Sequence, residues 1–236
     1  MGVHDGHRDR VRQDFIDKGE LSGFSDLHAL ELLLFYALRR GDTNPLAHRL
    51  LEKFGTLHGV FNASLHELMS VKGVGDSTAV LLRLVPQIAR RAEISKTHEI
   101  RAILSSSDAG NYCMPYFSFE DDEVLLMLCL DAKRRVIKCV EVGRGMANAV
   151  ESNLRLITET ALRCNACGIV LAHNHPDGIA LPSKEDNAAT KLLLAAIEPL
   201  GIEFVDHIIV AGGDFISYAD SGMLTLFRGA TGLAIF

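Results

Sequence analysis

The chain has 236 residues, of which 48% are hydrophobic, and a formal net charge of −6. This length can hold one medium domain and one smaller domain, each with a core of its own. Its apolar runs fall well short of the roughly 20 residues of a membrane span, and its first twelve residues are polar and charged. The odd number of cysteines, five, argues against a disulfide framework. We therefore expect a cytoplasmic protein without membrane attachment.

The first part of the chain, residues 1–100, is predicted to form a helical domain. Apolar residues recur there at helical spacing from Ser25 to Arg91. Asn44 is predicted to cap a helix whose first residue is Pro45, and Gly55 is predicted to end that helix.

A short turn between two further helices is the most specific feature of this region. Ser64 and Glu67 have the spacing of a capping box, which predicts the start of one helix. The helix leads into Val-Lys-Gly-Val-Gly at 71–75, after which Asp76 or Ser77 can cap the next helix. This arrangement resembles a helix-hairpin-helix unit, in which backbone N–H groups and a helix N-terminus can approach a phosphate.

Charge is the simplest indicator of whether such a unit binds DNA. Residues 1–100 contain 13 Lys and Arg and 13 Asp and Glu, so this part of the chain is formally neutral. Strong nonspecific DNA binding normally requires a basic face. Cationic residues do cluster locally, at Arg39-Arg40, at Arg90-Arg91 and at Lys72. DNA contact and a purely structural or protein-docking role both remain open.

Residues 108–236 are predicted to form a second, α/β domain. The segment from Thr97 to Tyr116 has a mixed composition and is predicted to be the junction between the two domains. Beyond it, short apolar runs alternate with helical patterns: strands at 124–130, 135–141, 169–172 and 203–210, and helices at 152–164 and 184–198. The fold class is therefore α/β, preceded by a smaller all-α domain.

Two histidines follow one of these strands. Gly168 to Ala172 is a short apolar run typical of a strand buried on both faces, and His173 comes directly after it. Residues i and i+2 of an extended segment share a face, and Pro176 favours extended dihedral angles at His175. Both imidazoles can therefore point the same way, whereas Asn174 points elsewhere.

A carboxylate follows at the start of the next helix. Asp186 lies in the first predicted turn, three residues after Ser183, so both side chains can face the strand end. Ser183-x-x-Asp186 also resembles a capping box, with Asp in place of Glu. A catalytic zinc requires three protein ligands and one open position, which two histidines and one acid would provide. The pattern allows both interpretations.

These residues, together with Glu123, resemble the JAMM (MPN+) zinc metalloprotease signature, and the surrounding sequence resembles the RadC family. The residues similar to that family are Leu171 to Pro176, Pro182-Ser-x-x-Asp186, Asp206 to Val210, and Arg144-Gly145 with Asn148 and Arg155. The resemblance covers nearly the whole chain. It implies an MPN (cytidine-deaminase-like) α/β domain with a mixed sheet, and the family's association with DNA repair adds a DNA-binding accessory role as the alternative function.

The resemblance also implies roles for individual residues. It implies Zn²⁺ held by His173, His175 and Asp186, and hydrolysis of a peptide or isopeptide bond in a protein or peptide substrate. Glu123 would be the general base and acid, because it precedes the Leu-Asp pair at 130–131 at the family spacing. Ser183 would stabilise the oxyanion. Glu120 is the alternative to Glu123 within the acidic run at 120–123.

This chain departs from the family pattern in two places. The loop after His175 contains Asp177, Ile179 and Ala180 where the family usually has His-Pro-Ser-Gly-Asp-Pro, and Arg155-Leu156 stands where Arg-Glu is expected. The predicted metal ligands are unchanged by these departures. The family's substrate contacts are therefore not carried over to this loop, and Arg144 and Asn148 are candidate substrate contacts by family likeness alone.

Cys164-x-x-Cys167 is a rival metal site or redox pair. At about 3.3 Å per extended residue, Cys167 and His173 would be roughly 20 Å apart, too far to share one ion. The chain also lacks the His-x-Glu and Pro-Cys-x-x-Cys of zinc deaminases. We expect ordinary thiols at these cysteines, and a structural or supporting role rather than metal ligation for His207.

Overall fold

The computed structural model describes residues 5–145, 150–176 and 178–231, so Asn148 and Asp177 lie outside the described residues. The chain divides into two compact units, Met1–Arg91 and Ala92–Phe236, each of which is described by itself. None of the helices in the described ranges combines the length and the apolar character that crossing a membrane requires.

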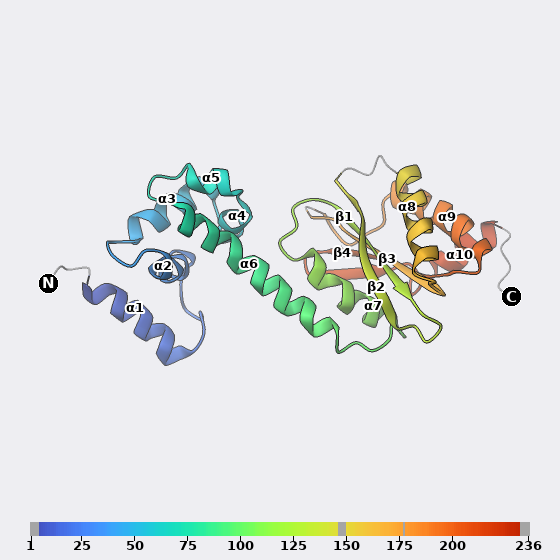
Figure 1. The fold of residues 1–236 in the computed structure, drawn as a ribbon, viewed down its shortest axis with the longest axis horizontal. Helices are drawn as coiled ribbons and strands as arrows, with labels where there is room; N and C mark the ends of the chain where they lie inside the picture. The colour runs from blue at the N-terminus through green and yellow to red at the C-terminus, as the bar shows by residue number, and fades with distance from the viewer. Residues whose placement is uncertain (1–4, 146–149, 177, 232–236) are drawn as a thin grey trace. The chain divides into compact units, whose positions relative to one another are not determined.

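The N-terminal unit is helical. Its helices are α1 (Asp5–Lys18), α2 (Asp26–Ala37), α3 (Asn44–Phe54), α4 (Leu57–Asn62), α5 (Leu65–Met69) and the first part of α6 (Asp76–Thr97) (Figure 1). Leucines from several of these helices form a buried core, among them Leu30, Leu50, Leu68 and Leu82. The helical spacing of apolar residues therefore predicted this region correctly, except that α1 precedes the predicted range.

Local capping determines where these helices begin and end. Ser64 and Glu67 form the predicted capping box of α5, and Gly55 ends α3 with φ of 80°. The predicted cap at Asn44 is wrong, because Asn44 is the first residue of α3 and Thr43 precedes it. The Asn44 amide instead donates to the buried carboxylate of Glu31 at 3.4 Å.

The C-terminal unit is a five-stranded mixed sheet with helices on both faces. Its elements are α7 (Ser106–Cys113), β1 (Val124–Leu130), β2 (Val136–Arg144), α8 (Val150–Arg163), β3 (Gly168–Asn174), α9 (Lys184–Ile197), β4 (Glu203–Ala211), β5 (Asp214–Ser217) and α10 (Met223–Thr231), with short 3-10 turns at Met114–Phe117 and Glu198–Leu200. The strand order is β2-β1-β3-β4-β5. Only the β3–β4 pair is parallel, so the sheet is mixed, as the resemblance implied.

The two faces of the sheet have separate cores. Figure 1 shows α8, α9 and α10 on one side of the sheet and α7 on the other. Within β3, Ile169 and Leu171 pack toward α8 to α10, whereas Val170 and Ala172 pack toward α7. Because side chains alternate along a strand, His173 projects on the α9 side.

The segment predicted to be the junction contains a helix, α7, that the sequence pattern did not predict. Ser105 and Asp108 form a capping box that begins the helix, and the helix packs on the sheet. Gly110 lies against the ring of Phe215 in β5, and a Cβ at this position would be 2.5 Å from that ring. The glycine that weakens the helical pattern in the sequence is thus required by close packing.

Candidate metal centre

His173 and His175 lie side by side at the end of the central strand. β3 continues through Asn174, two residues beyond the predicted end, because His173 pairs with Leu125 of β1 and with Ile209 of β4. The His175 N–H donates to the Val210 carbonyl at 2.9 Å, which keeps the chain extended. The two Nε2 atoms are 3.0 Å apart.

Asn174 lies on the other side of the strand, as the alternation predicts. Its side-chain oxygen accepts the Val124 N–H at 2.7 Å, and its amide nitrogen donates to the Asp122 carbonyl at 3.0 Å. These two bonds fix the start of β1 against the end of β3. The acidic run at 120–123 is thereby held at the same edge of the sheet as the two histidines.

Asp186 at the start of α9 completes a group of three. Its Oδ1 is 3.1 Å from His173 Nε2, and its Oδ2 is 3.5 Å from His175 Nε2. One donor atom from each residue lies within 4.8 Å of the others. Ligands about 2.0–2.2 Å from a tetrahedral zinc are separated by roughly 3.3–3.5 Å. The chemistry and spacing of these three side chains therefore fit one such ion.

Ser183 orients this carboxylate. Its N–H and its hydroxyl both donate to Asp186 Oδ2, at 2.8 and 2.6 Å, and its Oγ accepts the Asp186 N–H at 3.0 Å. This is the capping box of α9. The box holds Oδ2 and directs Oδ1 toward His173, so the capping and ligand interpretations of the sequence are compatible.

The surroundings of Asp186 favour its charged form. Burial raises the pKa of this carboxyl, but the adjacent His173 ring and the hydrogen bonds from the Ser183 hydroxyl and N–H outweigh burial and hold the pKa well below its usual range. Asp186 is therefore an anion at neutral pH, the state that a metal ligand requires.

His207 lies directly behind His173. It is 3% exposed, and its Nε2 is 2.9 Å from His173 Nδ1. Its Nδ1 is 2.7 Å from the hydroxyl of Thr190 in α9, and its ring stacks on Tyr218. Burial lowers the pKa of His207 well below its usual value, so the ring is neutral near pH 7.

Glu123 lies beside the group without touching it. It directly precedes β1, its side chain is exposed, and its carbonyl accepts the Gly145 N–H at 2.9 Å. Leu125 pairs with His173, so Glu123 occupies the position opposite His175 on the same face of the sheet. Within the described ranges its carboxylate has no hydrogen bond or ion pair with the three grouped side chains.

Glu120 is already engaged in an ion pair. Its carboxylate is 2.6 Å from the guanidinium of Arg144, which also contacts Glu141 at 2.7 Å. These two carboxylates raise the pKa of Arg144. Glu120 is thus less available than Glu123 for acid–base chemistry.

Arg155, on the exposed face of α8, pairs with Glu159 at 2.7 Å.

The two cysteines of the rival motif lie at the opposite end of β3. The Cys167 N–H donates to the Leu130 carbonyl, and the Cys167 carbonyl accepts the Glu203 N–H, so Cys167 immediately precedes the strand. Cys164 and Cys167 are both free. Within the described residues, the group able to hold an ion contains no cysteine.

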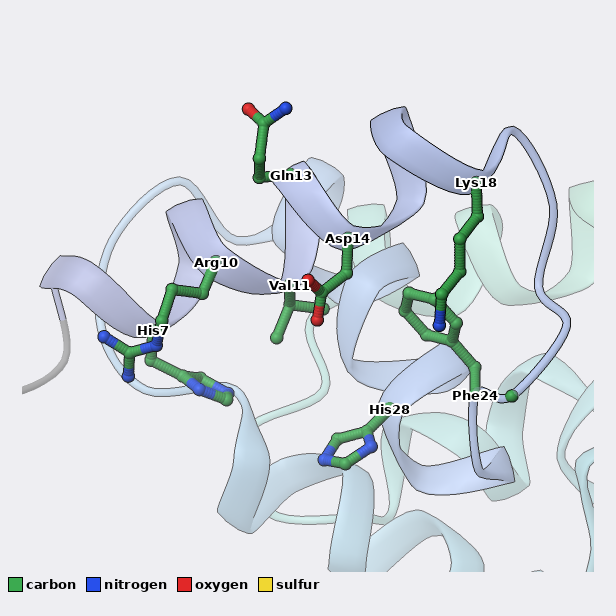
Figure 2. A pocket seen from close by; sticks show the side chains of 9 residues that line it. His7, Arg10, Val11, Gln13, Asp14, Lys18, Phe24 and His28 are labelled. Atoms are coloured by element: carbon green, nitrogen blue, oxygen red, sulfur yellow. The ribbon is translucent and has the colours of Figure 1, made fainter.

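The N-terminal unit has a hollow of about 380 Å³ beside α1 (Figure 2). Its side chains come from one face of α1 and from the chain around the start of α2, including Arg10, Asp14, Lys18 and His28. Among the described residues these groups do not converge closely enough to share an ion. The hollow is therefore not a candidate metal site among the described residues.

The fold is an α/β domain with a mixed sheet, in which two histidines at the end of the central strand and an aspartate at the start of α9 form a group that could hold a metal ion. The profile of the RadC-like JAB domain family matches residues 103–223, just over half of the chain. The match extends from the residues preceding α7 to the start of α10 and includes Glu123, both histidines, Ser183 and Asp186. The chain belongs to the RadC family.

Proposed function

We propose that the protein is a zinc-dependent hydrolase that cleaves a peptide or isopeptide bond in a protein or peptide substrate. The observation that carries this proposal is the convergence of His173 Nε2, His175 Nε2 and the Asp186 carboxylate within 4.8 Å. These are three ligands of the type found in catalytic zinc sites, which keep a fourth position open. Bound zinc would supply a Lewis acid and lower the pKa of a water in that position.

Glu123 is the proposed general base and acid. Its carboxylate is exposed and occupies the position opposite His175, on the face of the sheet that carries the ligands. From there it can take a proton from the attacking water and pass it to the leaving amine. Its exposure in this structure leaves the side chain free to turn toward a bound substrate.

Ser183 is the proposed oxyanion donor. Its single hydroxyl proton is now donated to Asp186 Oδ2 at 2.6 Å, and a hydroxyl can donate only one strong hydrogen bond at a time. Stabilising a developing oxyanion would require a rotation of this hydroxyl. The Ser183 N–H would keep Asp186 in place during that rotation, because it donates to the same Oδ2 at 2.8 Å.

The first test combines metal analysis with hydrolysis. The purified protein should contain one zinc per chain and should cleave members of a peptide and isopeptide library. Glu123→Gln should retain zinc and lose hydrolysis by about 10²- to 10⁴-fold, the usual contribution of acid–base catalysis. Glu120→Gln is the matched control, and we expect it to retain both properties. Wild-type protein without stoichiometric metal, or full hydrolysis by Glu123→Gln, would reject the proposal.

A second candidate function is DNA contact by the N-terminal unit, in an accessory role in DNA repair or recombination. The observation that favours it is the tight turn between α5 and α6, where Gly73 has φ of 101° and Lys72 is exposed. Lys72→Gln should weaken salt-sensitive binding to duplex DNA, whereas Lys96→Gln, at the end of α6, should not. Equal affinity of these two variants, or no affinity at low salt, would reject this function.

The five free cysteines support placing the protein in a reducing compartment such as the cytoplasm.

A further inference from the structure

A line of three hydrogen bonds leads from the backbone of Asp186 to the ring of His173. The Thr190 hydroxyl donates to the Asp186 carbonyl at 2.6 Å. The oxygen of this hydroxyl also lies 2.7 Å from His207 Nδ1. His207 Nε2 then lies 2.9 Å from His173 Nδ1. Thr190 is fully buried, and neither ring is more than 8% exposed. The line therefore runs through the interior, where water does not compete for these groups.

The first bond fixes the direction of all the others. A carbonyl oxygen can only accept, so the Thr190 hydroxyl uses its one proton on Asp186. Toward His207 the same oxygen must accept, which places the His207 proton on Nδ1. In a neutral imidazole the other nitrogen is then an acceptor. His207 Nε2 consequently accepts a proton from His173 Nδ1, and the lone pair of His173 Nε2 faces the ligand group.

Metal binding by His173, at the other end of this line of hydrogen bonds, requires the same tautomer. A metal ligand binds through an unprotonated nitrogen, so a His173 that binds through Nε2 must carry its proton on Nδ1. The only acceptor that the described residues offer to this proton is His207 Nε2. A doubly protonated His207 would donate from both nitrogens and would force the His173 proton onto Nε2. The proton pattern set by Thr190 thus matches the one that metal binding needs.

His175 reaches the same tautomer by a different route. Its Nδ1 lies 3.2 Å from the Ile179 carbonyl, which can only accept, so the proton is on Nδ1 and Nε2 is free. The backbone supplies this orientation, and no side chain is needed. Only His173 depends on side chains, so its tautomer can be altered by substitution.

We propose that Thr190 and His207 are positioning residues that hold His173 in the tautomer with Nε2 open to the metal. The proposal rests on the zinc site of the proposed function and not on the bond that is cleaved. The line begins at the backbone of Asp186, so it also couples a ligand on α9 to a ligand on β3. Tyr218 supports the middle of the line, because its ring is stacked on His207 at 4.8 Å with 19° between the planes.

Substitutions at Thr190 test the hydroxyl with little change in shape. Thr190→Val removes the hydroxyl, and Thr190→Ser retains it. Thr158→Val is the matched control, because Thr158 also donates to a carbonyl four residues earlier on a helix, at 2.8 Å, but has no histidine partner. The measurements are zinc affinity by chelator competition, the absorption spectrum of the cobalt-substituted protein, and thermal unfolding of each metal-free variant.

Thr190→Val should weaken zinc affinity by about 10- to 100-fold, the usual effect of losing a group that orients a ligand, and should alter the cobalt spectrum. Thr190→Ser and Thr158→Val should stay close to the wild type. His207→Gln should weaken zinc at least as much as Thr190→Val, and the double variant should be no weaker than His207→Gln, because both act through one line of bonds. If metal-free Thr190→Val does not fold, Thr190→Ser and His207→Gln carry the test.

Unchanged zinc affinity in Thr190→Val, or equal weakening in Thr190→Ser, would overturn the proposal. A wild type that binds no zinc would overturn this proposal and the hydrolase together. A wild type that binds zinc tightly but cleaves nothing would count against the hydrolase alone, since the affinities of the variants would still be measurable.

Discussion

The candidate metal centre has an inner wall and an outer wall that are built differently. The inner wall, formed by His173, His207 and Thr190, is buried and held by side-chain hydrogen bonds. The outer wall, formed by His175 and the loop at 178–181, is held through a backbone carbonyl, and Ile179 there is 68% exposed. One wall is suited to fixing ligand geometry, and the other is accessible to a substrate.

Removing a ligand from either wall should have the largest effect. His173→Ala and His175→Ala should each reduce zinc binding far beyond the roughly 10- to 100-fold expected for a supporting residue. The two metal-free variants should differ in stability. His173→Ala should lower the free energy of unfolding, because it removes a buried, hydrogen-bonded ring. His175→Ala should change it less, because the His175 side chain is more exposed. Elemental analysis and chemical denaturation measure the two effects. Stoichiometric zinc in His175→Ala would show that the outer wall is not part of the site.

Lowering the pH should reduce the free energy of unfolding through His207, which belongs to the inner wall. The pKa of His207 is lowered from 6.5 in the folded protein, so below pH 6.5 the unfolded chain binds a proton that the folded chain does not. The contribution of His207 to stability is therefore largest above pH 6.5, and it falls as the pH drops toward the folded-state pKa, by up to about 1.4 kcal/mol per pH unit. The lowered pKa of Asp186 acts in the same direction, but only below its usual value of 3.8.

Denaturation of metal-free protein between pH 7 and pH 5 measures this slope. His207→Gln should be less stable at pH 7 but should show a smaller slope, because the titrating ring is gone. Histidines that do not contact His207 are common to both proteins and cancel in the comparison. Parallel slopes for wild type and His207→Gln would contradict a buried neutral His207.

The capping box of α9 contains Asp186, which contacts a histidine of each wall. Its serine, Ser183, has a matched counterpart in Ser105, which caps α7. Ser183→Ala removes a cap and one hydrogen bond to Asp186 Oδ2, and Ser105→Ala removes the equivalent cap of α7. Each should cost about 1 kcal/mol in the free energy of unfolding. Only Ser183→Ala should also weaken zinc affinity, since only its partner, Asp186, is a proposed ligand. Equal zinc affinity in the two variants would show that the cap does not orient Asp186.

The sequence predicted the parts of this site that depend on local rules. The buried strand before His173, the shared face of His173 and His175, and the cap at Ser183 all follow from spacing within a few residues. The line through Thr190 and His207 could not be predicted, because it requires β4 to lie parallel to β3 with the register that pairs Leu171 with His207. The sequence nevertheless favoured for His207, beside Asp206, the supporting role that is proposed here.

The fold shows the same division between local and distant effects. The helical region and most strands were predicted, because periodicity and turn residues are local. The extension of β3 to Asn174 was missed because it depends on pairing with β1 and β4. Helix α7 was missed because Gly110 interrupts its pattern, and the reason for that glycine, the ring of Phe215, lies more than a hundred residues away. α1, β5 and α10 were also not predicted, and β2 extends to Arg144.

The smallest effect on zinc affinity is expected at Ile179, in the loop that follows His175. Ile179→Asp should leave zinc affinity unchanged, because the carbonyl and not the side chain contacts His175. The free energy of unfolding should change by less than about 0.5 kcal/mol, as is usual for an exposed side chain. An exposed apolar side chain beside a ligand can instead contact a substrate, so KM for a cleaved peptide should change while kcat is retained. Weaker zinc binding in Ile179→Asp would show that the outer wall, like the inner wall, depends on its side chains.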